Sequence, residues 1–482
     1  MKILLAASEM APFAGSEAFG GAVAAMASEL QSRGNEVSVV LPYYRSIREL
    51  GASKAKKTGV KFSVALGTGR SSCEIREGRA PGGVQVFFVE RDEFFDRSGL
   101  YGVDGRDYQD NAARFIFFAK AVVELVRRME PSPEIVHACN WQAALVPVFA
   151  TEAKLPVSTV LGTQSLEFQG NFWSYDFGLT NLPGQYFSAR GLEYYGSMNM
   201  LKGGVLFADS VVVPGPRYVA EVQTPVAGCG LESVMRENSA KLEGIPEGIS
   251  PALWNPATDK VITKRFKNAE SRAASRQVEW QKLGFTAKAA GPALVLTTDA
   301  MLTDGIELAI GAFDRLVEAG AQLLVLGPEH PEQTEAIEFA VRKHRGSLVR
   351  IASPTEPSWR QAIAAADALL ITAPLRPDTA MLSQALRYGT IPVALACGGL
   401  HQIIPPVDKG GSEGVGFFFY AATINAAIDS IRAMDTVRAN PPLWNAIVNR
   451  AMGVDISWAG TAQRLENLYN SLRARGNMRS AA

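Results

Sequence analysis

Short apolar runs alternate with amphipathic segments through the first half of the chain. The runs at residues 3–7 and 36–42 have the length of a buried strand, and residues 22–33 between them have the spacing of a helix that ends before Gly34. Strands that alternate with helices in this order predict a parallel sheet with helices on both faces. Further strands are predicted at 84–90, 135–138 and 157–161, with a long helix at 111–129.

The same alternation begins again near residue 293. Residues 243–260, between the two patterns, are rich in Pro, Gly and Asn and are typical of a linker. We therefore predict an α/β protein with two Rossmann-like, doubly wound domains that face each other across a deep interdomain cleft, followed by a helix at 458–475 and a frayed end. Strands are predicted at 293–298, 322–327, 348–352, 368–372 and 391–395, and helices at 305–319, 332–344, 359–366 and 379–388.

Charge and cysteine content exclude several classes of protein. Lys plus Arg and Asp plus Glu number 48 each, so the chain has no overall field that would attract nucleic acid or an anionic membrane. No apolar stretch approaches the roughly 20 residues of a membrane-spanning helix. The four cysteines are far apart and form neither a CxxC pair nor a metal-binding pattern. We predict a cytoplasmic protein with no metal, no cofactor and no nucleic-acid or membrane partner.

The first loop, SEMAPFAGSEAFGGAV at residues 8–23, lies between a predicted strand and a predicted helix. Strand, glycine-bearing loop and helix form the layout of a phosphate-binding turn. This loop carries Glu17 and no Lys or Arg, which is the wrong charge for a phosphate. Its glycines are also compatible with a plain tight turn that binds nothing.

A series of short motifs occurs in a fixed order along nearly the whole chain. In that order and spacing the chain resembles bacterial glycogen synthases and plant starch synthases. The resemblance implies the GT-B fold and retaining transfer of glucose from ADP-glucose to an α-1,4-glucan. It assigns 1–243 to the acceptor side, 244–456 to the nucleotide-sugar side and 457–482 to a helix that crosses back to the first domain. The motifs are SEMAPF at 8–13, HACNWQAALVP at 137–147, EFQG at 167–170, GLEYYGSMNMLKGG at 191–204, LWNPATD at 253–259, ALRYGTIPV at 385–393 and GGL at 398–400.

Positions that the family uses for the reaction and the donor carry other residue types here. The family's active-site aspartate and histidine correspond to Asn140 and Gln164. The arginine and lysine that clamp the donor pyrophosphate in the family correspond to Asp299 and Asp304. The glutamate that begins the donor-sugar turn corresponds to Arg376. By this resemblance none of these catalytic positions is intact.

The charge changes act against a nucleoside diphosphate. Opposite unit charges at about 4 Å attract by roughly 1–4 kcal/mol between the water and near-surface limits, and two acidic replacements turn that attraction into repulsion. The resemblance also places a lysine that contacts the donor in the first loop, and this chain lacks it. Together, the three changes are expected to weaken donor binding by on the order of 5–10 kcal/mol. We also expect Arg376 to form an internal ion pair with Asp299 or Asp304 that closes the phosphate site.

Other family positions keep their identity or their polarity. The resemblance assigns Glu9, Gly15, Tyr101 and Gln169 to substrate binding, together with Gly398 and Gly399. Plain loop anchoring is the alternative role for Glu9 and Tyr101. Aromatic residues at 168, 172, 173, 175 and 177 are suited either to stacking on sugar rings or to packing under a long loop. His137 ends a buried strand, so a satisfied core histidine is the favoured interpretation.

Three functions follow from these observations. The substitutions favour a weakly active or inactive homologue that binds α-1,4-glucan or has a regulatory role, with ADP-glucose a poor ligand. An active glycogen synthase or glycosyltransferase with an altered donor is the alternative. A third hypothesis is a subunit that associates with an active synthase. Fold alone does not decide among them, because function depends on the site.

Overall fold

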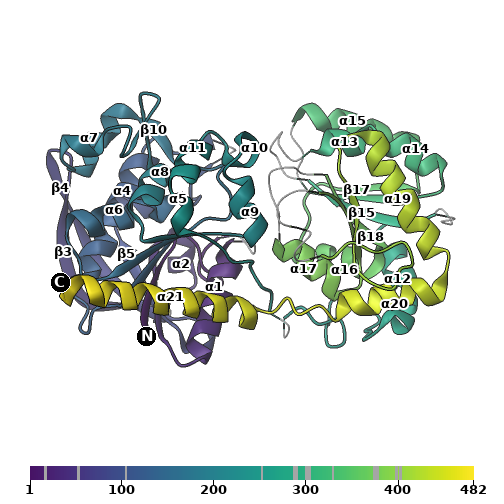
Figure 1. The fold of residues 1–482 in the computed structure, drawn as a ribbon, viewed down its shortest axis with the longest axis horizontal. Coiled ribbons are helices and arrows are strands. Elements are labelled where there is room, and N and C mark those ends of the chain that lie inside the picture. Colours follow the sequence, from purple (N-terminus) through teal and green to yellow (C-terminus); the bar gives the residue numbers. More distant parts are fainter. Residues whose placement is uncertain are drawn as a thin grey trace. The chain divides into compact units, whose positions relative to one another are not determined.

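The computed structural model describes residues 1–481 except 16–18, 52–54, 104–105, 251–252, 286–290, 299–304, 328–330, 373–378, 397–399 and 401–403. The chain divides into two compact units. Unit 1 consists of Met1–Glu247 and Trp458–Ala482, and unit 2 consists of Gly248–Ser457. Both units contain a mostly or wholly parallel sheet with helices around it, which confirms the predicted α/β class (Figure 1).

The sheet of unit 1 has nine strands in the order β14-β13-β9-β8-β1-β2-β5-β4-β3. From β14 to β5 neighbouring strands pair in parallel. These strands are β1 (Lys2–Ala6), β2 (Glu36–Pro42), β5 (Gln85–Glu90), β8 (Ile135–Cys139), β9 (Ser158–Gly162), β13 (Ser210–Val213) and β14 (Leu242–Gly244).

An antiparallel hairpin that the sequence did not reveal completes this sheet at one edge. It consists of β3 (Lys56–Leu66) and β4 (Gly69–Arg79), and β4 pairs antiparallel with β5. Most of its residues are exposed or half-buried. An antiparallel edge with a solvated face lacks the continuous apolar run that marks a central parallel strand.

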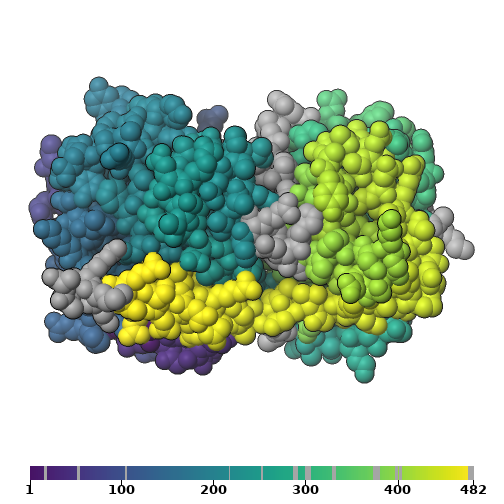
Figure 2. Space-filling view, in the orientation of Figure 1, coloured from purple at the N-terminus to yellow at the C-terminus, as the bar shows by residue number. Residues whose placement is uncertain are grey.

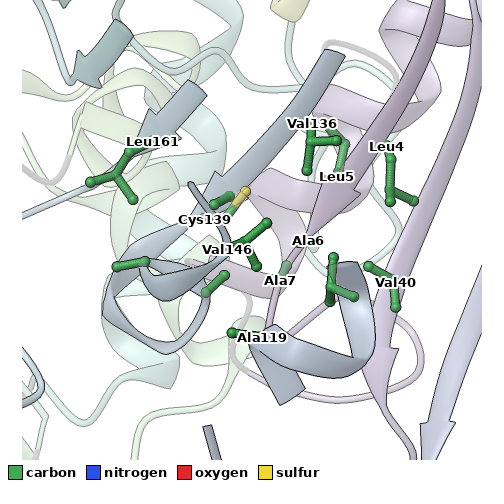
Figure 3. Packing of buried hydrophobic residues seen from close by; sticks show 14 of the residues in the cluster. Leu4, Leu5, Ala6, Ala7, Val40, Ala119, Val136, Cys139, Val146 and Leu161 are labelled. Atoms are coloured by element: carbon green, nitrogen blue, oxygen red, sulfur yellow. The ribbon is translucent and has the colours of Figure 1, made fainter. Parts of the chain in front are cut away.

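The core of unit 1 is built around β1, which lies between β2 and β8. Leu4 and Leu5 point to opposite faces of the sheet and are both fully buried. Figure 3 shows them in one cluster with residues of the neighbouring strands and of two covering helices, among them Ala119 and Val146. The helices around this core include α1 (Phe19–Ser32), α4 (Asn111–Val126) and α6 (Leu145–Glu152).

The C-terminal helix α21 (Trp458–Ala481) belongs to unit 1 and packs against α1. Its Leu465, Tyr469 and Leu472 are buried, and Thr461 Oγ1 donates a hydrogen bond of 2.8 Å to the carbonyl of Pro246. Figures 1 and 2 show this yellow helix beside the purple N-terminal residues. It continues to Ala481, beyond the end at residue 475 that the sequence predicted.

A small antiparallel sheet lies apart from the main sheet of unit 1. Its strand order is β10-β12-β11. Short helices fill much of the remaining chain. The strands of the small sheet are β10 (Asn171–Trp173), β11 (Glu193–Tyr194) and β12 (Ser197–Asn199), and a separate two-stranded sheet consists of β6 (Gly102–Val103) and β7 (Arg106–Asp107). The short helices are α2 (Arg45–Glu49), α3 (Asp92–Phe95), α5 (Asn140–Ala143), α7 (Phe177–Thr180), α8 (Met200–Phe207), α9 (Pro216–Glu221), α10 (Pro225–Gly228) and α11 (Glu232–Glu237).

The sheet of unit 2 is parallel throughout, in the order β17-β16-β15-β18-β19-β20. This order reverses direction between β15 and β18, as in a doubly wound sheet whose ligands bind at the reversal. The strands are β15 (Ala293–Thr297), β16 (Gln322–Leu326), β17 (Leu348–Ile351), β18 (Ala368–Ile371), β19 (Ile391–Leu395) and β20 (Phe417–Phe419).

The helices α12, α16, α19 and α20 of unit 2 begin at side-chain caps, whereas α13 and α14 have none. Asn268 and Thr355 form capping boxes at the starts of α12 and α16. The helix predicted at 305–319 is two short helices that separate at Gly311 and Ala312, where glycine lowers the helix propensity. The helices are α12 (Ala269–Lys282), α13 (Ile306–Ile310), α14 (Phe313–Glu318), α15 (Pro331–Lys343), α16 (Glu356–Ala365), α17 (Thr379–Arg387), α19 (Ile424–Arg438) and α20 (Pro441–Met452).

No helix in the described part of the chain is both long enough and apolar enough to cross a membrane.

Candidate functional site

The candidate site of unit 1 lies where its parallel strands end. Glu9 follows β1, Asn140 follows β8 and Gln164 follows β9, and these three strands are neighbours in the sheet. Glu247 follows β14 at the end of the same sheet. Because the carboxyl ends of parallel strands lie at the same end of the sheet, the loops that follow them gather there. Ligands usually bind at this end of such a sheet.

Glu9 is buried and Tyr101 half-buried, and the two form a hydrogen-bonded pair in this region. The Tyr101 hydroxyl donates to Glu9 Oε1 at 2.6 Å and lies 2.7 Å from Ser8 Oγ. Ser8 is fully buried and Glu9 is 7% exposed. Burial, with the nearby Tyr44 and Glu9, raises the pKa of Tyr101 well above its usual value. Tyr101 therefore remains a hydrogen-bond donor to the carboxylate at neutral pH.

Arg114 on α4 holds the segment that leads to Tyr101. Its guanidinium is fully buried and donates to the carbonyls of Phe94 at 2.7 Å and Leu100 at 2.8 Å, and to Asn111 Oδ1 at 2.6 Å. Asn111 in turn donates to the carbonyl of Tyr101 at 2.9 Å. The position of Tyr101 is thus fixed from α4 through backbone carbonyls.

Gly15 supports Glu9 from the first loop. Its φ is +102°, and a Cβ at this position would lie 2.1 Å from Glu9 Oε2. A side chain at residue 15 therefore requires both a left-handed backbone and a displaced carboxylate. The substrate-binding role of Gly15 stays a prediction, and Glu17 lies outside the described residues.

Replacing Gly15 with alanine is expected to destabilise unit 1 and displace Glu9. The matched control is Gly34→Ala, because Gly34 has a similar φ of +91° and nothing within 4 Å of the added Cβ. Both variants place an alanine in left-handed backbone, so this cost is common to both. The collision with Glu9 is therefore expected to lower the unfolding free energy of Gly15→Ala by about 1–3 kcal/mol more than that of Gly34→Ala. Chemical unfolding of the two variants measures the difference. Equal losses would show that Glu9 moves away at no cost.

Asn140, Gln164 and Glu247 form a continuous hydrogen-bonded series. Asn140 Oδ1 accepts from the backbone N–H of Gln164 at 3.1 Å, and Gln164 Nε2 donates to Glu247 Oε1 at 2.8 Å. Asn140 has a φ of +59°, a conformation that asparagine tolerates better than most residues. The structure thus brings together the two predicted residues Asn140 and Gln164, and it adds Glu247.

A pocket of about 70 Å³ lies beside this series. The side chains of Asn140, Gln164 and Glu247 form part of its wall, and most of the rest is apolar. The apolar part comes from α1, from the strand ends and from the start of α21. Lining residues include Phe19, Val23, Met26, Val213, Ile245, Trp458 and Leu465.

His137 and Cys139 also border the pocket, and neither is charged at neutral pH. His137 Nδ1 lies 2.7 Å from the Tyr469 hydroxyl of α21, and burial lowers the pKa of His137 to about 4. Burial raises the pKa of the Cys139 thiol to about 12. The interpretation of His137 as a satisfied core histidine is confirmed by this contact, and Cys139 is unsuited to act as a thiolate nucleophile.

Acid is expected to destabilise the protein partly through His137. An unfolded histidine takes up a proton near pH 6.5, whereas folded His137 does so only near pH 4, so stability falls as the pH drops from 6.5 to 4. The shift corresponds to a loss of about 3 kcal/mol across that range. The difference in the pH dependence of unfolding between the wild type and His137→Gln gives the contribution of His137, because the titrating carboxylates are the same in both proteins. Superimposable profiles would contradict the prediction.

Gln169 has a role in the local fold. Its Nε2 donates to the carbonyls of Leu166 and Cys229, both at 2.8 Å, and its Oε1 accepts from Asn199 at 2.7 Å. Asn199 Oδ1 in turn caps α8 by accepting from the N–H of Lys202. Gln169 is 7% exposed, so its assignment to substrate binding stays a prediction that these contacts do not favour.

The aromatic cluster separates into half-buried and exposed members. Phe172 packs on Trp141 with ring centroids 5.7 Å apart, and Phe177 packs on Phe187 at 5.1 Å. Trp173 and Tyr175 are exposed. Phe168 is 49% exposed.

The donor-side predictions fall in unit 2 on positions outside the described residues. These are Asp299, Asp304, Arg376, Gly398 and Gly399. The expected ion pair of Arg376 with Asp299 or Asp304 therefore also falls outside the described residues. Within the described residues, no group of three or more His, Cys, Asp and Glu side chains is placed to hold a metal ion.

Arg114 is a site residue that the sequence did not single out, and Glu247 was noted only as the first residue of EGIS at 247–250, which stands where the resemblance places the family's linker motif Asn-Gly-Val-Asp. Glu247 lies in a Pro- and Gly-rich stretch that was assigned to the linker, and composition does not show which side chain of a linker points back to the sheet. Arg114 is an arginine within an otherwise apolar predicted helix, and this was a usable signal in the sequence. Arginine is almost never fully buried without partners, and the structure shows Arg114 fully buried.

Comparison with known proteins gives a consistent result over the whole chain. Residues 2–237 match the family model described as the starch synthase catalytic domain. The chain is 34% identical to glycogen synthase 2 of Geobacter sulfurreducens, covering 97% of this chain and 98% of that protein. It is 31% identical to glycogen synthase of Opitutus terrae, covering 97% and 99%.

Solved structures give the same relationship. The catalytic domain of starch synthase IV from Arabidopsis thaliana, bound to ADP and acarbose, matches with a TM-score of 0.85 and 26% identity, covering 98% of this chain and 99% of that chain. Sucrose-phosphate synthase from Thermosynechococcus elongatus matches with a TM-score of 0.59 and 15% identity over 98% and 99%, which shows a shared fold alone.

Proposed function

The chain belongs to the glycogen and starch synthase family, and we propose that it binds α-1,4-glucan but transfers glucose from ADP-glucose weakly or not at all. The observation that carries the proposal is the hydrogen bond from Gln164 Nε2 to Glu247 Oε1 at 2.8 Å. It joins Gln164, which lies at a substituted family position, to Glu247.

The chemistry of the amides supports a loss of transfer. A carboxylate can stabilise developing positive charge, and an imidazole can exchange a proton near neutral pH, but the amides of Asn140 and Gln164 do neither. Both amides also have protein partners, since Asn140 Oδ1 accepts from the Gln164 backbone at 3.1 Å. Acid–base assistance of this kind contributes about 10²–10⁴-fold in enzymes.

The sequence of unit 2 supports weak binding of the donor. Asp299 and Asp304 take the positions where the family resemblance places an arginine and a lysine. A nucleoside diphosphate gains negative charge as it leaves, so cations at these positions stabilise the transition state and anions oppose it. We extend the proposal to Arg376, which would neutralise one of the two aspartates.

Glucan binding is supported by the part of the site that keeps family residues. Glu9 and Tyr101 retain their family identities and are held in place by Ser8, Arg114 and Gly15. The related starch synthase IV domain was solved with acarbose as well as ADP. We propose that the glucan binds at the ends of the strands that carry Glu9 and the loop of Tyr101 in unit 1.

The proposal includes the domain roles given by the family. Residues 1–243 are assigned to the acceptor side, 244–456 to the nucleotide-sugar side and 457–482 to the returning helix. Cys73, Cys139 and Cys229 are free thiols, which supports a reducing compartment such as the cytoplasm. Association with an active synthase is part of the proposal as a regulatory role.

Transfer of labelled glucose from ADP-glucose to glycogen tests the enzymatic part. We expect turnover at least about 10²-fold below that of an ordinary bacterial glycogen synthase assayed in parallel. Turnover within tenfold of that reference enzyme would contradict the proposal. Co-sedimentation with glycogen tests the binding part separately, and a protein that stays wholly in the supernatant does not bind glucan.

An active glycogen synthase, or a glycosyltransferase with an altered donor, is the second candidate. It is favoured by the whole-length similarity to proteins named glycogen synthase. The same transfer assay with a panel of nucleotide sugars distinguishes it. Rapid transfer from any of them to glycogen would establish this candidate in place of the first.

A further inference from the structure

Trp173 and Tyr175 form an exposed aromatic pair on unit 1. Trp173 is 68% exposed and Tyr175 is 75% exposed. Their ring centroids lie 4.4 Å apart with the planes inclined by 48°. Tryptophan is among the side chains that are mostly buried on average, and exposed apolar residues that gather in one place mark interaction surfaces.

The fold holds this pair on a supported backbone. Trp173 ends β10, whose residues pair antiparallel with β12, and Tyr175 follows in the next turn. Because successive residues of a strand point to opposite faces, Phe172 packs inward on Trp141 while Trp173 points outward.

The surroundings of the pair fit an uncharged, hydroxyl-rich ligand. The segment at residues 171–178, NFWSYDFG, contains one charged residue, Asp176, and no cation. It therefore offers nothing to a phosphate or another anion. Aromatic faces carry partial negative charge and attract the C–H faces of a sugar ring, while the exposed Asn171 amide and the Asp176 carboxylate can bond to hydroxyls.

We propose that Trp173 and Tyr175 are a docking platform for an α-1,4-glucan chain, with the sugar rings stacked on the two aromatic faces. The inference rests on the proposed function, in which this protein binds α-1,4-glucan, and it assigns residues to that binding.

The platform is separate from the Glu9–Tyr101 pair, and a series of packed aromatic rings lies between the two. Tyr101 packs on Phe115 at 5.9 Å, Phe115 on Trp141 at 5.0 Å, and Trp141 on Phe172 at 5.7 Å between ring centroids. Phe172 directly precedes Trp173. A continuous series of packed rings thus connects the platform to the Glu9–Tyr101 pair within unit 1.

Co-sedimentation of the full chain with glycogen tests the platform. The variant Trp173→Ala with Tyr175→Ala is expected to bind glycogen about tenfold or more weakly than the wild type, as for the loss of central aromatic contacts. The matched control is Phe339→Ala with Tyr420→Ala, which removes side chains that are 62% and 75% exposed on unit 2. This control is expected to bind as the wild type does. Trp173→Phe, which keeps a ring, is expected to retain most of the affinity.

The outcomes separate this inference from the proposed function. If the wild type binds glycogen and the double platform variant binds equally well, the platform assignment is wrong and the proposed glucan binding stands. An equal loss in the control variant would also overturn the assignment, because it would reflect general surface apolarity. If the wild type does not bind glycogen, both the proposed glucan binding and the platform fail.

Discussion

Asp259→Ala is expected to destabilise unit 2 by about 3–5 kcal/mol, the range seen when one partner of a buried ion pair is removed. The Asp259 carboxylate lies 3.2 Å from Arg360 Nη1, and the two side chains are only 3% and 4% exposed. The same carboxylate accepts a hydrogen bond from the Tyr388 hydroxyl. Without it, Arg360 is left buried between Glu356 and the ring of Trp254, with its charge only partly compensated.

Hydrogen exchange resolved by peptide is the suitable measurement, because a chain of two units need not unfold in a single step. Asp314→Ala is the control, since that carboxylate is 51% exposed and bonds to Lys343 and His344 at the surface. Its loss is expected to cost less than about 1 kcal/mol. Similar effects of the two variants would show that the Asp259 cluster contributes no more than a surface pair.

This cluster explains two of the motifs that identified the family. LWNPATD at 253–259 contains Trp254 and Asp259, and ALRYGTIPV contains Tyr388. In the sequence these motifs were only markers of resemblance, because nothing in them shows that residues more than a hundred positions apart share one buried charge. The structure gives them a physical role in holding unit 2 together.

Most central parallel strands of both sheets were predicted for a simple reason, whereas the short strands β13, β14 and β20 were not predicted. A parallel strand covered on both faces needs a continuous apolar run, so the run at residues 293–298 identified β15 almost to the residue. The β3–β4 hairpin has one solvated face and no such run, and it was missed. The break at Gly311 was missed because the apolar spacing continues across it.

The site could be predicted only in its residue types. The resemblance selected Glu9 and Tyr101, but their hydrogen bond spans 92 positions and becomes visible only when β1 and α4 are placed. Gln164 was recognised as a substituted position, whereas its bond to Glu247 was not expected. Spacing along the chain carries no information about pairs that depend on where loops from different strands meet.

Asp299→Arg combined with Asp304→Lys is expected to raise the affinity for ADP by roughly 30-fold or more. Each unit pair at about 4 Å contributes roughly 1–4 kcal/mol, and about 1.4 kcal/mol corresponds to tenfold in affinity. Asp429→Arg combined with Glu318→Lys is the control, because it changes the net charge by the same amount on exposed helix positions of unit 2. Titration calorimetry with ADP at two salt concentrations separates the two variants, since the gain at a specific phosphate site should exceed the general effect of net charge.

Recovery of donor binding is not expected to restore transfer by itself. Asn140 and Gln164 would remain amides bonded to their protein partners, so the Asp299→Arg, Asp304→Lys variant should bind ADP and still transfer glucose slowly. Adding Asn140→Asp and Gln164→His is expected to raise turnover by a further 10²-fold or more, the usual contribution of positioned charge and proton transfer. If the first two substitutions alone restored turnover, the amides would be adequate for catalysis and donor charge would be the main defect. If they gave no gain in ADP affinity over the control, the donor site would differ from the family at more than these charges, and an altered donor would become the better explanation.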